Sequence, residues 1–465
     1  MWNAAGFPDI FFDEGIYMRR AMHVLAGLGP QESFFHDHPY FGQLFLAAAF
    51  YLTGFPASLH PIPTADSISS LYLVPRIMMG ALAVVDTYLI YRIADRRYGQ
   101  RAALVSAMLF AVMPMTWVVR RILLDSILLP FLLGSILLAM GTRDGRPKNV
   151  MVLLSGILMG VAIFTKIPAF TMIPLVAGMV YFGSGKNTRM LVLWIVPAIL
   201  IPAVWPAQSV EAGQFGSWLH DVASQAHRPT YGLPYISSVF LQMDPVLFVM
   251  GVAGSAISIY RRDYFILMWI VPFVILLLSV GFNQYFYWIP VLPVFCISSS
   301  LLLSRILVPG AGIKKKMVYL GVVLGVGAFG LSSTVMLIST DMTSSQFQAA
   351  AYLLGQVKDG QNDTTILASP VYSWVLSSAF HRQNVLPDYT QVLWQPLPTK
   401  KFILAADQHY FIDMKRGPQV EHLFNDSSTM ATFNGDAKRY DVLHYPYTSI
   451  RETYGGGQIE IRGGK

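Results

Sequence analysis

The first residues that could do chemistry are an acidic pair, Asp13-Glu14, and the run His36-Asp37-His38. Adjacent carboxylates on a helix point in different directions, so one can face a substrate while a partner holds the other. An acidic group in a low-dielectric pocket can serve as a general base toward a hydroxyl. Most acidic pairs, however, are solvated surface groups. The His-Asp-His run could hold a divalent metal, but no second ligand cluster follows at a defined spacing to support such a site.

A second group of ionisable residues borders or interrupts long apolar runs. Arg76 lies about one turn inside such a run, Arg120 and Arg121 form a tight link between two runs, Asp125 follows a turn later, and Lys166 marks the next link on the same side. Ionisable groups at membrane depth are costly and are usually functional or paired. Cations near the interface suit a lipid phosphate, which arginine can bind in bidentate fashion. The alternative is interfacial snorkelling with a structural ion pair between Arg76 and Asp125.

The composition predicts the apolar helices that must position these groups. Of 465 residues, 54% are hydrophobic and only 13% are charged, and the mean hydropathy is +0.49, which excludes an ordinary soluble protein. The only cysteine, Cys296, lies in an apolar run, so neither an intrachain disulfide nor a thiolate metal site can form. Roughly 20 apolar residues cross a bilayer, and about ten runs approach that length. They are 71–93, 101–119, 121–140, 150–165, 167–183, 190–206, 245–260, 264–281, 285–304 and 317–339.

Lysine and arginine in the connections predict the orientation of these spans, because cytoplasmic connections carry an excess of both. The net charge of +7 comes from short clusters rather than from one stripe, which argues against nucleic acid as a partner. One set of alternate connections holds only Arg120, Arg121, Lys166 and Arg228. The other set, which we assign to the cytoplasm, holds Arg92, Arg96, Arg97, Arg101, Arg143, Arg146, Lys148, Lys186, Arg189, Arg261, Arg262, Arg305, Lys314, Lys315 and Lys316.

The C-terminal tail alternates between helix-like and strand-like patterns. A helical pattern at 346–358 precedes an apolar strand-like run at 364–369, and a helix-like stretch near Trp374 precedes a second strand-like run at 402–406. Helix and strand in alternation predict a small α/β domain.

The fold class predicted is therefore an all-α polytopic membrane domain with a small C-terminal α/β extracytoplasmic domain. The short apolar run at 41–55 is interpreted as a helix in the outer interface, because a further span would invert the first loop. We expect a first external loop with interfacial helices at 1–70, a transmembrane helical domain at 71–339 and a soluble domain at 340–465. The distribution of lysine and arginine over the connections predicts that residues 1–70, 207–244 and 340–465 are extracytoplasmic.

The order of these motifs along the chain resembles the glycosyltransferase C superfamily. The resemblance covers roughly residues 10–340 and is strongest to protein O-mannosyltransferases and to the aminoarabinose transferase of lipid A. Each motif alone is short, and their order carries the likeness. The motifs are Phe12-Asp13-Glu14, His38-Pro39-Tyr40, Pro75-Arg76, Arg120-Arg121-Ile122-Leu123-Leu124-Asp125 and Thr165-Lys166-Ile167-Pro168.

The resemblance implies roles for these residues. Asp13 becomes the catalytic base with Glu14 beside it, and the basic residues of the outer ends become ligands of a donor lipid phosphate: Arg76, Arg120, Arg121 and Lys166. His38 and Asp125 are carried over as substrate-binding residues. Members of the superfamily begin with a transmembrane helix before the acidic motif, whereas twelve residues precede Asp13, so the expected first helix is missing from this sequence. His38-Pro39-Tyr40 stands where relatives often carry a double proline.

The activity implied is transfer of a sugar from a polyprenyl-phosphate donor to a protein, glycan or lipid acceptor at the outer face, with inversion. No phosphate-cradling glycine loop suggests a nucleotide-sugar site. The competing class is a transporter or flippase for a lipid-linked or anionic solute, because intramembrane charges also mark permeation paths. A noncatalytic scaffold is a third possibility. Cations at one end of the spans, together with the lack of a visible repeat, favour the enzyme.

Overall fold

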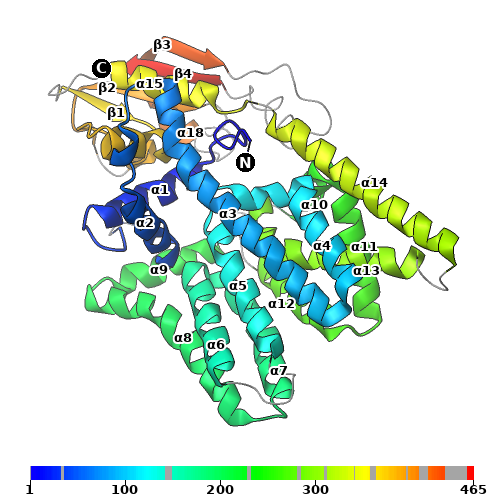
Figure 1. Ribbon diagram of the computed structural model, residues 1–465. Helices are drawn as coiled ribbons and strands as arrows, with labels where there is room; N and C mark the ends of the chain where they lie inside the picture. Colours follow the sequence, from blue (N-terminus) through cyan, green and yellow to red (C-terminus); the bar gives the residue numbers. More distant parts are fainter. Residues whose placement is uncertain are drawn as a thin grey trace.

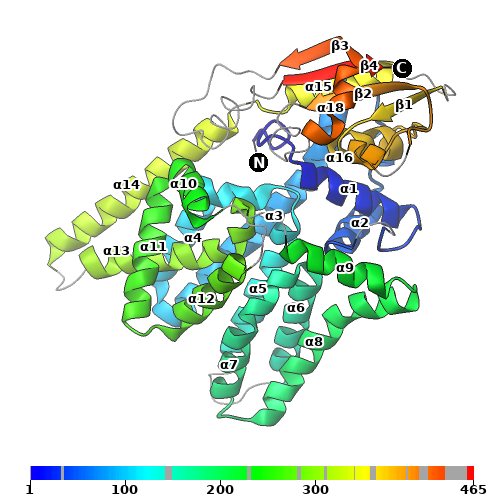
Figure 2. The same ribbon diagram turned by 180° about the vertical axis from the view of Figure 1, so that it is seen from behind.

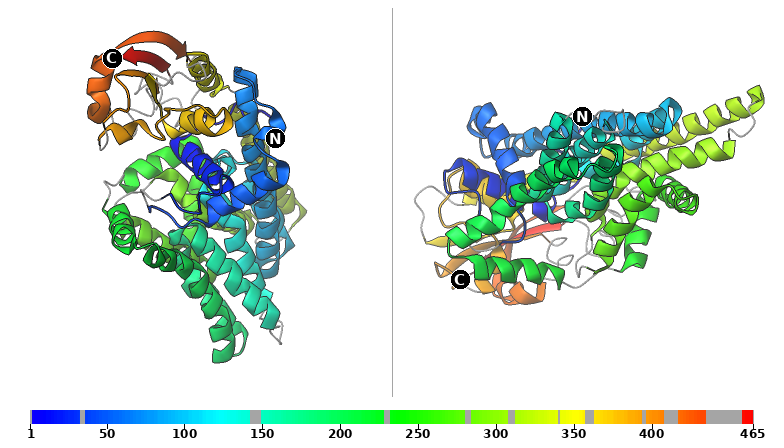
Figure 3. Two further views of the ribbon diagram at one scale, coloured as in Figure 1. Left: turned by 90° about the vertical axis from the view of Figure 1, so that its left-hand side faces the viewer. Right: turned by 90° about the horizontal axis from the view of Figure 1, so that it is seen from below.

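The computed structural model describes residues 2–32, 36–141, 149–227, 232–279, 284–307, 312–339, 341–356, 363–393, 396–407, 417–434 and 458–464. Two helices near the N-terminus lie between a layer of apolar helices and a C-terminal α/β unit, as Figure 1 shows from one side and Figure 3 from two others. Four of the basic residues in the charge comparison lie outside the described residues: Arg143, Arg146, Lys148 and Arg228.

Each of the ten predicted spans falls on a helical segment of the apolar layer. Within the described residues, four of these segments are long and apolar enough to cross a membrane, α11 and α12 form a pair bent by 118°, and the others are shorter. The number of crossings stays a prediction. The segments are α3 (Ala65–Tyr98), α4 (Gln100–Val112), α5 (Leu124–Met140), α6 (Asn149–Thr165), η4 and α7 (Ile167–Met172, Ile173–Gly183), α8 (Thr188–Glu211), α11 (Pro245–Tyr260), α12 (Tyr264–Ser279), η5 and α13 (Tyr285–Val291, Leu292–Leu307) and α14 (Ile313–Ile338).

The helices form two groups on either side of the long helix α3, one of α5 to α8 and the other of α4 and α10 to α14 (Figures 1 and 2). Small residues allow close packing inside each group. A Cβ atom on Gly156 of α6 would lie 2.3 Å from the carbonyl oxygen of Trp194 on α8, and one on Gly254 of α11 would lie 2.2 Å from that of Ser298 on α13. Bulkier residues at these two glycines would separate the helices.

Short helices connect the layer with the outer part of the molecule. The run at 41–55 forms helix α2 (Phe41–Thr53), which ends at Gly54 in the left-handed conformation. The other short elements are α1 (Phe12–Leu25), η1 (Ala57–Leu59), η2 (Pro114–Arg120), α9 (Phe215–Ala226) and α10 (Leu233–Met243).

The C-terminal unit, here called the cap (described residues 341–464), is the predicted α/β fold with more strands than expected. The predicted elements appear as α15 (Ser344–Gln356), β1 (Thr364–Leu367), α16 (Pro370–Trp374) and β2 (Lys401–Asp407). The sheet has the order β1-β2-β4-β3, with β1 and β2 parallel and the other neighbours antiparallel. The elements not predicted are α18 (Gly417–Asn425), β3 (Ser427–Asn434) and β4 (Gln458–Gly464), and the remaining turns are η6 (Val375–Ala379) and η7 (Tyr389–Leu393).

Helix α1 is fixed between the cap and the apolar layer. Phe12 packs into the small apolar core of the cap beside Leu367 and Leu404. Gly15 approaches α16 so closely that a Cβ atom there would lie 2.4 Å from the backbone of Pro370. The acidic pair therefore starts a helix whose position is set by both parts of the protein.

Candidate active site

Glu14 is fully buried and lies between two arginines. The Arg76 guanidinium donates to it through Nε (3.2 Å to Oε2) and Nη2 (2.9 Å to Oε1), and Arg121 Nη1 donates to Oε1 at 3.1 Å. The backbone N–H groups of Phe11 and Ile122 donate to the same carboxylate, each at 3.1 Å. This many donors compensate the desolvation of a buried charge. Glu14 is thus bound by both arginines and by two backbone N–H groups.

Arg76 uses its donors within the protein. Its Nη1 donates to the carbonyl of Pro8 at 2.7 Å, and its Nη2 also donates to that of Asp9 at 3.2 Å. Arg121 binds Asp9 twice, at the carbonyl and at Oδ1, both at 2.7 Å. The arginines therefore hold the segment before α1 as well as Glu14. The alternative ion pair between Arg76 and Asp125 does not form, because each has another partner.

Asp125 pairs with Lys166, at the junction of α6 and η4. Both side chains are buried, and the Lys166 ammonium forms a short ion pair with Asp125 Oδ2. The ammonium also lies 4.1 Å from the ring centre of Tyr287, a cation–π contact. The loop before α2 borders this pair, since the ring of Tyr40 packs edge-on against Phe164 with 4.8 Å between centres.

Tyr17 links the candidate base with that ion pair. It lies one turn after Asp13 on α1 and is buried, and burial raises the pKa of its phenol well above the ordinary value. The negative charges of Asp13, Asp37 and Asp125 raise that pKa further, so all three carboxylates act on one phenol. The half-buried Asp13 and the ion pair of Asp125 and Lys166 are here called, with Tyr17, the Tyr17 cluster, because both carboxylates contribute to the electrostatic environment of this phenol. The sequence analysis missed Tyr17, although its spacing of four from Asp13 placed it on the same helix face.

The side chains of the His36-Asp37 run have separate protein partners. His36 is buried, with Nδ1 3.2 Å from Asp221 Oδ2 and Nε2 3.2 Å from Gln214 Oε1. Asp37 forms an ion pair with Arg20 at 2.7 Å. In the described part of the chain, no group of three or more His, Cys, Asp or Glu side chains is arranged to hold a metal ion. His38 is half-buried in the loop before α2.

Arg20 and Arg19 form a second buried network in the second half of α1. Both bind Glu32, at 3.3 Å and 2.8 Å respectively. Burial opposes the charge of Arg20, but Asp37 and Glu32 outweigh it and raise the pKa of the guanidinium. Burial also disfavours the charged form of Glu32, but the two arginines outweigh this effect and lower its pKa. These pairs fix the loop that follows α1.

Within the described residues, Arg120 binds neither Glu14 nor Asp125, although it shares a groove with Arg76. Its guanidinium stacks over the indole of Trp117, 4.0 Å from the ring centre, and its Nη2 donates to the carbonyl of Ala111 at 3.1 Å. Arg120 and Arg76 line one groove of about 610 Å³ between α3, α4 and α14. The remaining walls are largely apolar and include Val84 and Leu331. The four cations predicted as one phosphate site thus divide into a Glu14 clamp, the Lys166 pair and this groove.

Comparisons with known proteins agree with this architecture. Residues 29–184 match the family model described as dolichyl-phosphate-mannose-protein mannosyltransferase. The search of curated proteins found no match.

Two solved structures share the fold. ArnT from Cupriavidus metallidurans bound to undecaprenyl phosphate is 13% identical with a TM-score of 0.56, covering 99% of this chain and 95% of its own. The oligosaccharyltransferase AglB from Archaeoglobus fulgidus, in complex with an inhibitory peptide and a dolichol-phosphate, is 13% identical with a TM-score of 0.51, covering 84% of this chain and 65% of its own.

The apolar helices and these matches together identify a multi-pass integral membrane protein. The match over 29–184 includes six of the eight candidate site residues: His38, Arg76, Arg120, Arg121, Asp125 and Lys166. The family match and the shared fold confirm the resemblance of the chain to the glycosyltransferase C superfamily.

Proposed function

We propose that the protein is a membrane glycosyltransferase that moves a hexosyl group from a polyprenyl-phosphate donor to a hydroxyl acceptor at the extracytoplasmic face. The observation that carries the proposal is the contact between the first turn of α1 and the segment before α5: Glu14, beside Asp13, accepts from Arg121 Nη1 and from the Ile122 N–H, and this segment leads to Asp125 and its partner Lys166. A base and a cation close together suit a reaction that removes a proton at one atom and releases an anion at another.

In this mechanism Asp13 removes the proton of the acceptor hydroxyl as its oxygen attacks the anomeric carbon. The bond to the phosphate oxygen breaks, and the lipid phosphate leaves with the electron pair. Because displacement is direct, the anomeric configuration inverts. Glu14 takes no part in proton transfer; held by Arg76 and Arg121, it fixes the first turn of α1 and thereby the position of Asp13.

Lys166 is the proposed partner of the leaving phosphate. An ammonium has three N–H donors, and within the described chain Asp125 takes one while an aromatic ring covers part of its surface. A further N–H can therefore bind a phosphate oxygen.

The groove at Arg120 is the proposed site of the prenyl tail. Its apolar walls suit a hydrocarbon chain, and its lining includes Arg76, which also binds Glu14. The similar proteins support a lipid-linked donor, since the structures were determined with undecaprenyl phosphate and with a dolichol-phosphate, and the family model is described by a dolichyl-phosphate sugar.

The test is transfer from a radiolabelled polyprenyl-phosphate hexose by purified protein in liposomes. Asp13→Asn should abolish transfer to the acceptor and leave donor binding and the unfolding temperature unchanged. Asp66→Asn is the matched control, because Asp66 is an exposed acid in the first turn of α3. Wild-type turnover in Asp13→Asn would remove the assigned base. Counterflow of the donor without any transfer by the wild type would show a transporter instead.

A further inference from the structure

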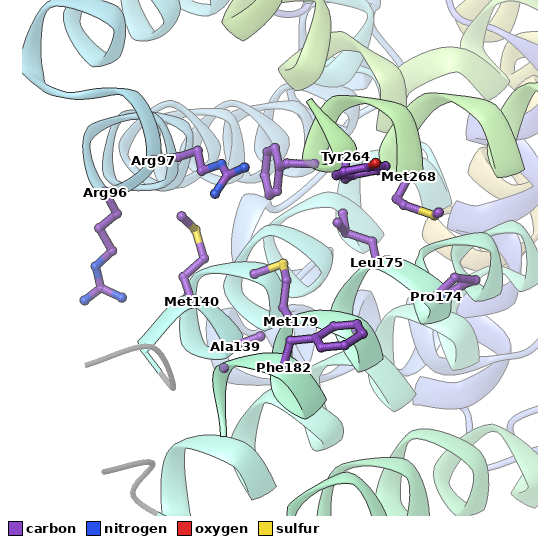
Figure 4. A pocket seen from close by; sticks show the side chains of 13 residues that line it. Arg96, Arg97, Ala139, Met140, Pro174, Leu175, Met179, Phe182, Tyr264 and Met268 are labelled. Carbon is purple, nitrogen blue, oxygen red and sulfur yellow. The ribbon is translucent and has the colours of Figure 1, made fainter. Parts of the chain in front are cut away.

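A second pocket lies far along the helices from the Tyr17 cluster, between α3, α5, α7 and α12 (Figure 4). Arg96 at its edge follows Arg76 by twenty positions on the continuous helix α3, a separation of about 30 Å. The pocket has a volume of about 560 Å³, within the range of about 300–1,000 Å³ that is common for ligand sites. It is therefore a separate cavity.

The walls of this pocket are apolar and flexible. Met140 comes from α5, Met179 and Phe182 come from α7, and Met268 comes from α12 (Figure 4). Phe182 is 69% exposed on the apolar helical layer, so lipid chains surround it in a membrane. Methionine adapts its shape to irregular hydrocarbon, which suits an acyl chain.

Two arginines at the end of α3 give the mouth of the pocket a positive charge. Arg97 Nη2 lies 3.5 Å from Asp263 Oδ1, and its guanidinium carbon lies 5.9 Å from the ring centres of Tyr98 and Phe265. Asp263 also accepts hydrogen bonds from the Tyr98 hydroxyl (2.8 Å) and the Phe265 N–H (3.2 Å). The single negative charge of Asp263 is shared among several donors. It does not neutralise the two positive charges of Arg96 and Arg97.

Arg96 binds only a neutral group in the described part of the chain. Its Nη1 donates to the carbonyl of Leu137 at 3.0 Å, and the side chain is exposed. A guanidinium carries five N–H donors, so most of those of Arg96 remain for another acceptor. An anion at the mouth of the pocket would accept hydrogen bonds from both guanidinium groups.

We propose that this pocket binds an anionic glycerophospholipid. Its phosphate lies at Arg96 and Arg97, and an acyl chain follows Met140, Met179 and Phe182. Charge complementarity selects an anionic headgroup, and the apolar walls select a lipid over free phosphate. Basic pockets between helices on the cytoplasmic side favour such headgroups, and the basic connections predict that face for the end of α3.

Lipid titration of the delipidated full-length protein, followed by native mass spectrometry, tests whether binding depends on the negative charge of the headgroup and on the two arginines. Wild-type protein should retain phosphatidylglycerol and bind phosphatidylcholine weakly. Arg96→Gln/Arg97→Gln should weaken phosphatidylglycerol binding about tenfold. The control Arg101→Gln/Arg189→Gln removes two exposed charges from the same predicted face, away from the pocket, and should bind like the wild type.

A second variant tests the walls without changing the charge. Gly178 lines the pocket, and a Cβ atom there would meet no heavy atom within 4 Å. Gly178→Leu should therefore fold normally, fill the space and weaken phosphatidylglycerol binding while both arginines remain. Equal binding of phosphatidylcholine, unchanged binding in both variants, or displacement of the lipid by inorganic phosphate at equal concentration would each overturn the proposal.

Discussion

Glu14 and Arg76, sixty-two positions apart in the sequence, form a buried two-point ion pair with atom separations of 2.9 and 3.2 Å. Glu14→Ala leaves Arg76 and Arg121 buried without their shared anion. We expect a loss of about 3–5 kcal/mol in the free energy of unfolding, because an uncompensated buried charge is costly. Thermal unfolding in detergent measures it as a lowered midpoint.

The control for this variant is an exposed ion pair of the cap. Lys401 and Asp363 lie 3.1 Å apart with more than half of each side chain exposed, so Asp363→Ala should leave the unfolding midpoint nearly unchanged. If Glu14→Ala were as stable as Asp363→Ala, the acidic pair would not anchor α1.

The pair of Lys166 and Asp125 allows structural and functional roles to be separated. Either Lys166→Met or Asp125→Leu alone leaves a buried charge and should destabilise the protein by about 3–5 kcal/mol. The double variant removes both charges and should regain most of the stability. It should still lack transfer activity, because the proposed phosphate ligand is gone.

Unfolding midpoints and transfer rates of the three variants check this expectation. Recovery of both stability and activity in the double variant would show that the pair serves only the fold. If the double variant recovered neither stability nor activity, its defect would lie in packing. Lys166→Arg should then be destabilised as well.

The apolar spans were predictable because length and hydropathy are local properties of the sequence. The last two strands of the sheet were harder to predict. β4 contains the buried residues Ile459 and Ile461 but follows a glycine run. β3 alternates only weakly between half-buried and exposed residues. In the described sheet, β4 pairs with β2, and β3 pairs only with β4, so the place of each strand depends on partners distant in the sequence.

Candidate site residues could be named from the sequence, and their roles stay predictions, but their hydrogen-bond partners could not be named. Arg76 and Asp125 lie at similar depth in their runs, which suggested a pair. Residues 4–9 instead fold back against Arg76 and supply carbonyl acceptors, while Glu14 arrives from the start of α1. Such contacts depend on the path of a loop, which no periodic pattern encodes.

Acid should weaken the loop that follows α1 through Glu32. Its pKa is lower in the folded protein than the ordinary value of 4.5, because Arg19 and Arg20 outweigh burial. The corresponding stability is therefore complete above pH 4.5 and is lost as the pH falls through the folded pKa. Glu32→Gln should unfold more easily at neutral pH and show a smaller loss on acidification; a parallel decline in both proteins would exclude Glu32 as a cause.

The Arg120 groove makes a prediction about donor tail length. Val84 lines the groove and is 68% exposed, so Val84→Trp should narrow it without disturbing the core. The KM for a long-chain polyprenyl-phosphate hexose should rise about tenfold, in line with the loss of several buried methylene contacts, whereas a short-chain analogue should be unaffected. Val85→Trp, at a neighbouring exposed position outside the groove lining, is the control. An unchanged KM for the long donor, or the same fold-change in KM for long and short donors, in Val84→Trp would place the prenyl tail elsewhere.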